Sequence, residues 1–184
     1  NVTGVQTCAL PIFRFSTRAE WQTDSAVPVD VYEWHDLEAG GETAIGAALH
    51  EVATFLTPDC LRARQLPPII VLISDGQPTD DFEAGFNALV QAPYGRGAVR
   101  IAVAIGGDAD LGMLQLFVGN DSLAPLQANT AEELVNRIKW ATTTPVKAVS
   151  TPTVGRSATA KLALSASHPD AASKSSVANN SLLW

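Results

Sequence analysis

The hydrophobic and polar positions of this chain follow two different spacings, and their alternation predicts strands separated by helices. Residues 69–73 form an unbroken aliphatic run, and residues 99–105 form an apolar run that is interrupted only by Arg100, which is typical of strands buried on both faces of a parallel sheet. Apolar residues recur at spacings of three and four, as helices with one buried face require, in the segments 45–56, 82–90, 111–118 and 130–141. This order predicts an α/β protein with a mostly parallel sheet.

The pattern changes toward the amino terminus. Apolar and polar residues alternate from Phe13 to Gln22, which predicts one strand with a single buried face. A second strand is expected over residues 27–34, where Pro28 favours an edge position, and the two strands are predicted to form a hairpin. A further short strand is expected at residues 123–126.

Polar residues before two of the predicted helices are candidate caps. Thr79 or Asp80 is expected to cap the helix over residues 82–90. Thr130 is expected to cap the last predicted helix, which begins directly after it. Their side-chain oxygens would accept hydrogen bonds from amide groups that have no partner inside the helix.

One folded domain is expected over residues 13–141, because the apolar periodicity ends near Trp140. Residues 142–184 are rich in Ser, Thr, Ala and Pro and have few large apolar side chains, so we expect a disordered tail. No apolar stretch approaches the roughly 20 residues that cross a bilayer, and no membrane span is expected.

The charge is acidic and unevenly distributed. Residues 1–144 carry 8 Lys and Arg against 18 Asp and Glu, which opposes nucleic-acid binding and suits cations or basic partners. Cys8 and Cys60 have no metal-type spacing and form no disulfide framework. Three scattered histidines do not favour a zinc site.

Two polar residues stand where an α/β sheet commonly binds ligands. Asp75 follows the strand at residues 69–73, and Thr43 lies in a glycine-flanked turn before a helix. Carboxylate and hydroxyl oxygens are ligands that Mg²⁺ and Mn²⁺ accept, and nearby glycines let backbone approach an ion closely. Two alternatives stay open: Thr43 as a helix cap, and Asp75 as an Asx turn or a cap.

These residues together resemble part of a von Willebrand factor type A (VWA) domain. Residues 40–46 (Gly-Gly-Glu-Thr-Ala-Ile-Gly) are similar to that family's threonine loop, and residues 73–76 (Ile-Ser-Asp-Gly) to its aspartate loop. The resemblance implies a doubly wound, Rossmann-like parallel sheet with helices on both faces. It also implies a metal-ion-dependent adhesion site rather than an enzyme, in which Thr43 and Asp75 help to hold Mg²⁺ or Mn²⁺.

In that site, the resemblance implies that a protein partner completes the shell of the ion with an acidic side chain. From their positions beside the two loops, Glu42, Gln77 and Asp80 are predicted to rim the contact. The run Asp-Gly-Gln-Pro-Thr-Asp at residues 75–80, with Trp140 before a Ser/Thr-rich tail, is similar to the bacterial branch associated with tellurium resistance. That branch implies a cytoplasmic stress-response role.

The chain departs from the family pattern at its beginning. No Asp-x-Ser-x-Ser, the family's principal metal loop, occurs in the sequence. Residues 2–12 resemble the translation of a sequencing-library adapter, so we expect residues 1–12 to be a non-native artefact. The domain is then expected to be N-terminally truncated, without its first strand and crossover helix. We expect unpaired strand edges, marginal stability and weak Mg²⁺ binding as a result.

The position of Asp75 is also compatible with a second class of function, a hydrolase. An aspartate at the end of a buried strand is also the nucleophile position of phosphatase-like hydrolases of the haloacid-dehalogenase type. Those enzymes need a second acid two positions further on, where this chain has Gln77. The binding module is therefore the favoured hypothesis, and a hydrolase that uses Asp75 is the alternative.

Overall fold

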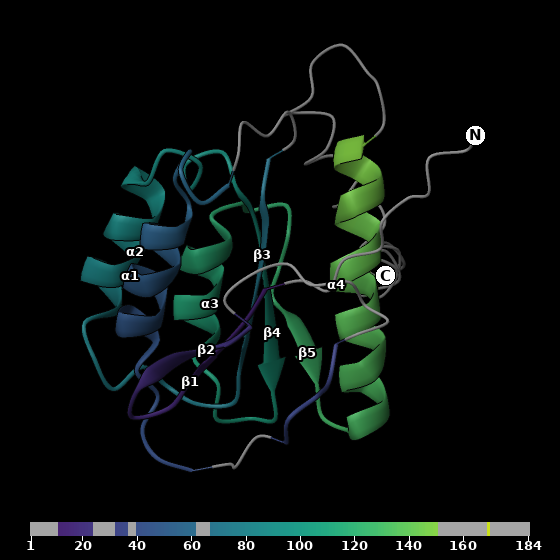
Figure 1. Cartoon of the computed structure of the whole chain (residues 1–184). Coiled ribbons are helices and arrows are strands. Elements are labelled where there is room, and N and C mark those ends of the chain that lie inside the picture. Colours follow the sequence, from purple (N-terminus) through teal and green to yellow (C-terminus); the bar gives the residue numbers. More distant parts are fainter. Residues whose placement is uncertain (1–10, 24–31, 37–39, 62–66, 151–168, 170–184) are drawn as a thin grey trace, which may run out of the picture. The chain divides into compact units, whose positions relative to one another are not determined.

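The computed structural model describes residues 11–23, 32–36, 40–61, 67–150 and 169. The chain divides into two compact units that interleave along the sequence. One contains residues 1–61 and 78–96, and the other contains residues 62–77 and 97–184. Each unit is described in turn, and Figure 1 labels the helices and strands of both.

The first unit begins with a hairpin of two antiparallel strands, β1 (Ile12–Phe15) and β2 (Ala19–Thr23). The chain reverses at residues 16–18, so the single strand predicted from Phe13 to Gln22 is wrong. The pairs Phe13 with Trp21 and Phe15 with Ala19 are symmetric about Thr17. Because the turn is centred on residue 17, the odd-numbered residues of both strands lie on the same face of the hairpin. The period-two pattern therefore continues through the turn and does not reveal it.

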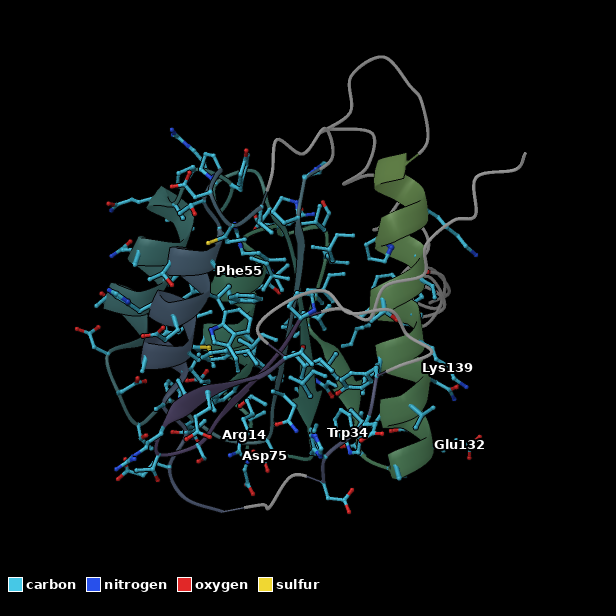
Figure 2. All side chains as sticks on the ribbon, viewed as in Figure 1. Arg14, Trp34, Phe55, Asp75, Glu132 and Lys139 are labelled. Atoms are coloured by element: carbon cyan, nitrogen blue, oxygen red, sulfur yellow. The ribbon has the colours of Figure 1, made fainter. Side chains whose placement is uncertain are left out.

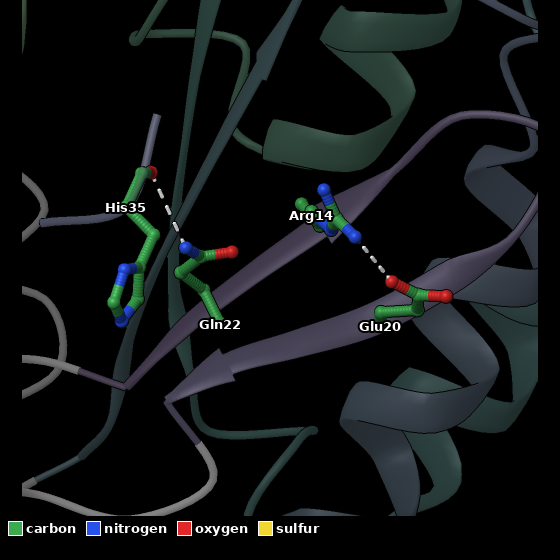
Figure 3. Close-up of polar contacts among 4 residues, drawn as sticks. All are labelled: Arg14, Glu20, Gln22 and His35. Carbon is green, nitrogen blue, oxygen red and sulfur yellow. Dashed lines mark hydrogen bonds and ion pairs between the residues drawn. The ribbon is translucent and has the colours of Figure 1, made fainter. Parts of the chain in front are cut away.

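Aromatic contacts hold the hairpin against helix α1 (Ile45–Phe55). The rings of Phe13 and Trp21 meet edge to face with centroids 4.8 Å apart, and Trp21 lies 5.0 Å from Phe55. On the exposed face of the hairpin, Arg14 pairs with Glu20 (Figure 3). This ion pair is nearly half exposed on both sides and adds little stability.

The second strand predicted for the hairpin, at residues 27–34, falls largely outside the described residues. Residues 32–34 are described and have no strand geometry. Close by, the Nε2 amide of Gln22 donates a hydrogen bond to the backbone oxygen of His35 over 3.3 Å (Figure 3). This contact fixes the segment 32–36 to the end of β2.

Helix α2 (Phe82–Gln91) lies beside α1 in the same unit, as Figure 1 shows, and both helices fall where the apolar spacing predicts them. Two glycines allow the close approach. A Cβ atom on Gly85 would lie 2.0 Å from the backbone oxygen of Gly46, and one on Gly46 would lie 2.2 Å from the oxygen of Asp81. Only hydrogen fits at these two positions.

The cap of α2 is Asp81, so the prediction of Thr79 or Asp80 is wrong by one or two positions. The carboxylate of Asp81 accepts a hydrogen bond from the Ala84 amide at 2.9 Å. The predicted cap at Thr130 is confirmed, because its hydroxyl accepts the Glu133 amide at 3.2 Å. Both bonds satisfy amides of the first helical turn.

The second unit is built on a parallel sheet in the order β3 (Ile69–Ser74), β4 (Val99–Ile105) and β5 (Leu126–Ala128). Helices α3 (Leu111–Val118) and α4 (Ala131–Ser150) lie on opposite sides of this sheet in Figure 1. The predicted α/β class with helices on both faces is confirmed. The three strands follow one another in sequence order, as in one half of a doubly wound sheet.

The core of this unit lies around β4, whose residues 101–104 are all at most 1% exposed. Phe117 of α3 and Leu126 of β5 are fully buried as well. Arg100, at the start of β4, donates from Nε to the Phe117 oxygen at 2.6 Å and so satisfies the end of α3. Partial burial lowers the pKa of its guanidinium from the usual value.

Two predictions for the strands need correction. The strand at residues 69–73 was expected to be buried on both faces, but within β3 only Leu72 and Ser74 are buried. In the described part of the chain β3 has one neighbour, β4, and an edge strand exposes more surface than a central one. The last strand lies at Leu126–Ala128, a few residues later than the expected 123–126.

Helix α4 extends beyond the predicted domain end at residue 141. It continues to Ser150, so the disordered tail predicted from residue 142 is wrong for residues 142–150. Ala141 and Pro145 are buried and extend the apolar stripe of Leu134 and Ile138 by the same spacing. Within the described residues, no helix is long and apolar enough to cross a membrane.

Candidate functional site

Thr43 lies in the first unit, in the loop that leads into α1, and its backbone is fixed by Thr79. The Thr43 amide donates to the Thr79 hydroxyl at 3.1 Å, and the Thr79 amide donates to the Thr43 oxygen, also at 3.1 Å. This reciprocal pair joins two loops that are 36 residues apart in the sequence. The backbone of Thr43 therefore has a defined position before any ligand is considered.

The hydroxyl of Thr43 is not the cap of α1. Ala44 occupies the N-cap position, and no side chain of the cap residue bonds to the helix. The helix-cap alternative for Thr43 is therefore wrong. Thr43 is half-buried, and its hydroxyl has no hydrogen bond to any other residue that the structure describes. This leaves the oxygen free to accept or donate a further bond.

Asp80 holds the amino terminus of α1 from a distant part of the sequence. Its two carboxylate oxygens accept hydrogen bonds from the amides of Gly46 at 2.8 Å and Ala47 at 2.7 Å. The first turn of α1 contains no acidic residue of its own. Asp80 therefore supplies the negative charge that favours this end of the helix dipole.

The glycine pair before Thr43 brings the loop onto the turn of the β1–β2 hairpin. Gly41 has a φ of +88°, and a Cβ atom there would lie 2.7 Å from the Thr17 hydroxyl oxygen. That oxygen accepts the Glu42 amide at 3.1 Å, and the Ala44 amide donates to the Ser16 oxygen at 3.0 Å. The side chain of Glu42 is left exposed. In this structure the glycines serve the fold of the loop.

Asp75 lies in the second unit, directly after β3 at the carboxyl end of the sheet (Figure 2). It is exposed, and no residue in the described part of the chain bonds to its carboxylate. The local turn is made by the buried Ser74 instead, whose hydroxyl donates to the Gly76 oxygen at 3.3 Å. The Asx-turn alternative for Asp75 is therefore wrong. Gln77, two residues further, is also exposed.

Thr43, Glu42 and Asp80 thus belong to one unit, and Asp75 and Gln77 to the other. Thr17 and Thr79 have structural roles in the Thr43 loop that sequence patterns did not reveal, because their partners are 25 and 36 residues away. The sequence pointed to Thr79 only as a candidate helix cap and as part of the motif at residues 75–80, not as a partner of Thr43.

The hydroxyl of Thr43 and the carboxylate of Asp75 are the kinds of oxygen ligand that a hard divalent cation accepts, but they are too few to surround one. A hydroxyl and a carboxylate oxygen are suitable ligands, and a magnesium ion takes six. Across the described ranges, no three residues of the types His, Cys, Asp and Glu gather into a possible metal site. In the described part of the chain, these residues do not complete a metal shell by themselves.

Comparison with solved structures finds a similar fold in the crystal structure of the ArnB paralog VWA2 from Sulfolobus acidocaldarius. The TM-score is 0.52 and the sequence identity 21%, over 68% of this chain and 32% of that chain. This chain thus spans about a third of that protein's length. No family model and no curated protein matches the sequence. At this identity the likeness shows the fold alone, which is the Rossmann-like fold of a VWA domain.

Proposed function

We propose that this chain is a protein-binding module of the VWA type and not an enzyme. The fold supports the general class, since VWA domains are generally interaction modules. The observation that carries the specific proposal is the free carboxylate of Asp75 at the carboxyl end of β3. Ligands of open α/β sheets bind at this end of the strands.

Metal dependence is the finer part of the proposal and rests on the resemblance. We propose that Asp75 and Thr43 each offer an oxygen to Mg²⁺ or Mn²⁺, and that a partner binds through an acidic side chain. A divalent cation would supply the positive charge that such a carboxylate needs. Because the described residues do not complete the shell, the affinity of this chain for the ion is expected to be weak.

The three rim residues differ in what their side chains are free to do. Glu42 and Gln77 are exposed and available to a partner. Asp80 already accepts two helix amides, so we propose that it acts chiefly by holding the Thr43 loop and α1 in place. The bacterial tellurium-resistance branch, with its cytoplasmic stress role, is part of this proposal through the motif at residues 75–80 and Trp140.

Titration of the full chain with MnCl₂, followed by the electron paramagnetic resonance of free Mn²⁺, tests the site. Weak binding is expected, with a Kd on the order of 1 mM, the range of the weakest oxygen-ligand sites. Asp75→Ala should weaken it at least about tenfold, because a charged ligand is lost. Asp121→Ala removes the same charge from another exposed position of the same unit and should change nothing.

Equal Mn²⁺ affinity in Asp75→Ala and the unmodified chain would refute the proposed ligand. A hydrolase assay separates the alternative class. Turnover of p-nitrophenyl phosphate that is lost in Asp75→Asn, which keeps the shape of the side chain, would replace the binding module by a phosphatase-like enzyme.

A further inference from the structure

The loop that leads into α1 is bonded at Thr43 to two other segments of the first unit. The Ala44 amide donates to the backbone oxygen of Ser16, in the turn of the β1–β2 hairpin, at 3.0 Å. The Thr43 amide donates to the Thr79 hydroxyl, and the Thr79 amide returns a bond to the Thr43 oxygen, both at 3.1 Å. All four residues belong to the first unit, so the contacts that position Thr43 are internal to it.

These bonds hold the two peptide groups that flank the Cα atom of Thr43. The group before it is held at its amide by the Thr79 hydroxyl. The group after it is held at both ends, by the Thr79 amide and by the Ser16 oxygen. Peptide groups are planar, so fixing both of them also fixes the direction of the Cα–Cβ bond between them. Because Thr43 is β-branched and has few side-chain rotamers, its hydroxyl is restricted to a small number of directions.

Thr79 differs from Ser16 in the group that makes the bond. Ser16 uses its backbone oxygen, which every residue has, whereas the Thr43 amide is bonded to the side chain of Thr79. This bond therefore requires an acceptor in the side chain at position 79, and a hydroxyl supplies it. The side chain of Thr79 is exposed, so its hydroxyl can be removed without opening a cavity in the core.

We propose that Thr79 is a positioning residue for cation binding, because its hydroxyl holds Thr43 with the side-chain oxygen already directed for a ligand. The inference rests on the proposed function, in which Thr43 offers an oxygen to Mg²⁺ or Mn²⁺. Thr79 itself does not bind the ion and acts through Thr43. A ligand group that is held in place before binding loses less conformational freedom when the ion arrives, and the affinity is higher for that reason.

Titration of the full chain with MnCl₂, followed by the electron paramagnetic resonance of free Mn²⁺, compares three variants. Thr79→Val removes the hydroxyl, keeps the shape of the side chain and should weaken Mn²⁺ binding about fivefold, the factor set by one hydrogen bond of typical strength. Thr79→Ser keeps the hydroxyl and should bind Mn²⁺ like the unmodified chain. Thr54→Val is the matched control in the same unit, since its hydroxyl donates to the Glu51 oxygen within α1, and it should leave the affinity unchanged.

A double-mutant cycle separates positioning from a general structural role. If Thr79 acts only through Thr43, Thr79→Val should have no further effect on Mn²⁺ affinity in a chain that already carries Thr43→Val. A general loosening of the unit would weaken binding in both backgrounds. The amide proton of Thr43 gives a readout that needs no metal. Its nuclear magnetic resonance should move upfield in Thr79→Val, where the hydrogen bond is lost, and should stay in place in Thr79→Ser.

Equal Mn²⁺ affinity in Thr79→Val and the unmodified chain would overturn the positioning role and leave the proposed function standing. The same loss of affinity in both backgrounds of the cycle would overturn it as well. So would an unshifted Thr43 amide proton in Thr79→Val, because the hydrogen bond would then be absent in solution. If the unmodified chain binds no Mn²⁺, the proposed function itself fails, and the positioning role fails with it.

Discussion

Replacement of Asp80 by alanine tests whether this residue holds the fold of the candidate site or acts only at its surface. The change removes both acceptors of the Gly46 and Ala47 amides, at 2.8 and 2.7 Å. Since α1 has no side-chain cap and no acid in its first turn, nothing else described in the structure replaces the lost charge. The helix that follows Thr43 should therefore become less stable at its amino terminus.

The expected loss follows from the two contributions that the carboxylate makes. Removal of a capping side chain typically costs about 1 kcal/mol. Loss of a negative charge at a helix amino terminus adds about 0.5–1 kcal/mol. The free energy of unfolding should fall by about 2 kcal/mol in Asp80→Ala and by about 1 kcal/mol in Asp80→Asn, which keeps one acceptor oxygen.

Urea unfolding, followed by far-ultraviolet circular dichroism and by the combined fluorescence of the four tryptophans, measures this difference. With a denaturant slope of about 2 kcal/mol per molar, the midpoint of Asp80→Ala should fall by about 1 M. Asp75→Ala is the matched control, because its carboxylate bonds to no described residue, and its effect should stay within about 0.5 kcal/mol. The proposed structural role of Asp80 is wrong if the two variants unfold at the same midpoint.

Three further variants test contacts inside the two units. Gly85→Ala should destabilise the protein by about 3 kcal/mol or more, because its Cβ meets the Gly46 oxygen at 2.0 Å. Gly112→Ala makes the same change at an exposed position of α3, where the nearest atom is the capping carboxylate oxygen of Asp110 at 3.3 Å, and should change the free energy of unfolding by less than about 1 kcal/mol. Arg100→Leu should cost about 1–3 kcal/mol, since the Phe117 oxygen loses a charged donor. An equal loss of stability in the two glycine variants, or an unchanged midpoint for Arg100→Leu, would contradict these contacts.

Much of the architecture was predictable because its signal is local. The strand at residues 99–105 and the helix at residues 111–118 have the bounds that the apolar pattern predicts. A continuous aliphatic run and a three-and-four spacing each report the periodicity of one element, whatever its neighbours are. The caps at Asp81 and Thr130 depend on nearby residues only, and there the prediction was exact or wrong by one or two positions.

The errors fall where a distant contact or a neighbouring element decided the outcome. The hairpin turn at residues 16–18 leaves the alternation undisturbed, and the burial of Pro145 against the sheet unit extends α4 in spite of a composition typical of disorder. The aliphatic run at residues 69–73 predicted a strand, and that was correct. Its burial was wrong, because burial depends on how many strands flank it.

For the candidate site, the sequence by itself determined which residues could do chemistry: an aspartate after a buried-type strand and a threonine among glycines. Only the tertiary structure decided what each side chain is free to do. It leaves the carboxylate of Asp75 open, uses that of Asp80 to hold α1, and positions Thr43 through Thr79. The physical reason is that a hydrogen bond forms between whichever groups the fold brings within about 3 Å of each other, and partners 33 to 36 residues apart leave no periodic signal in the chain.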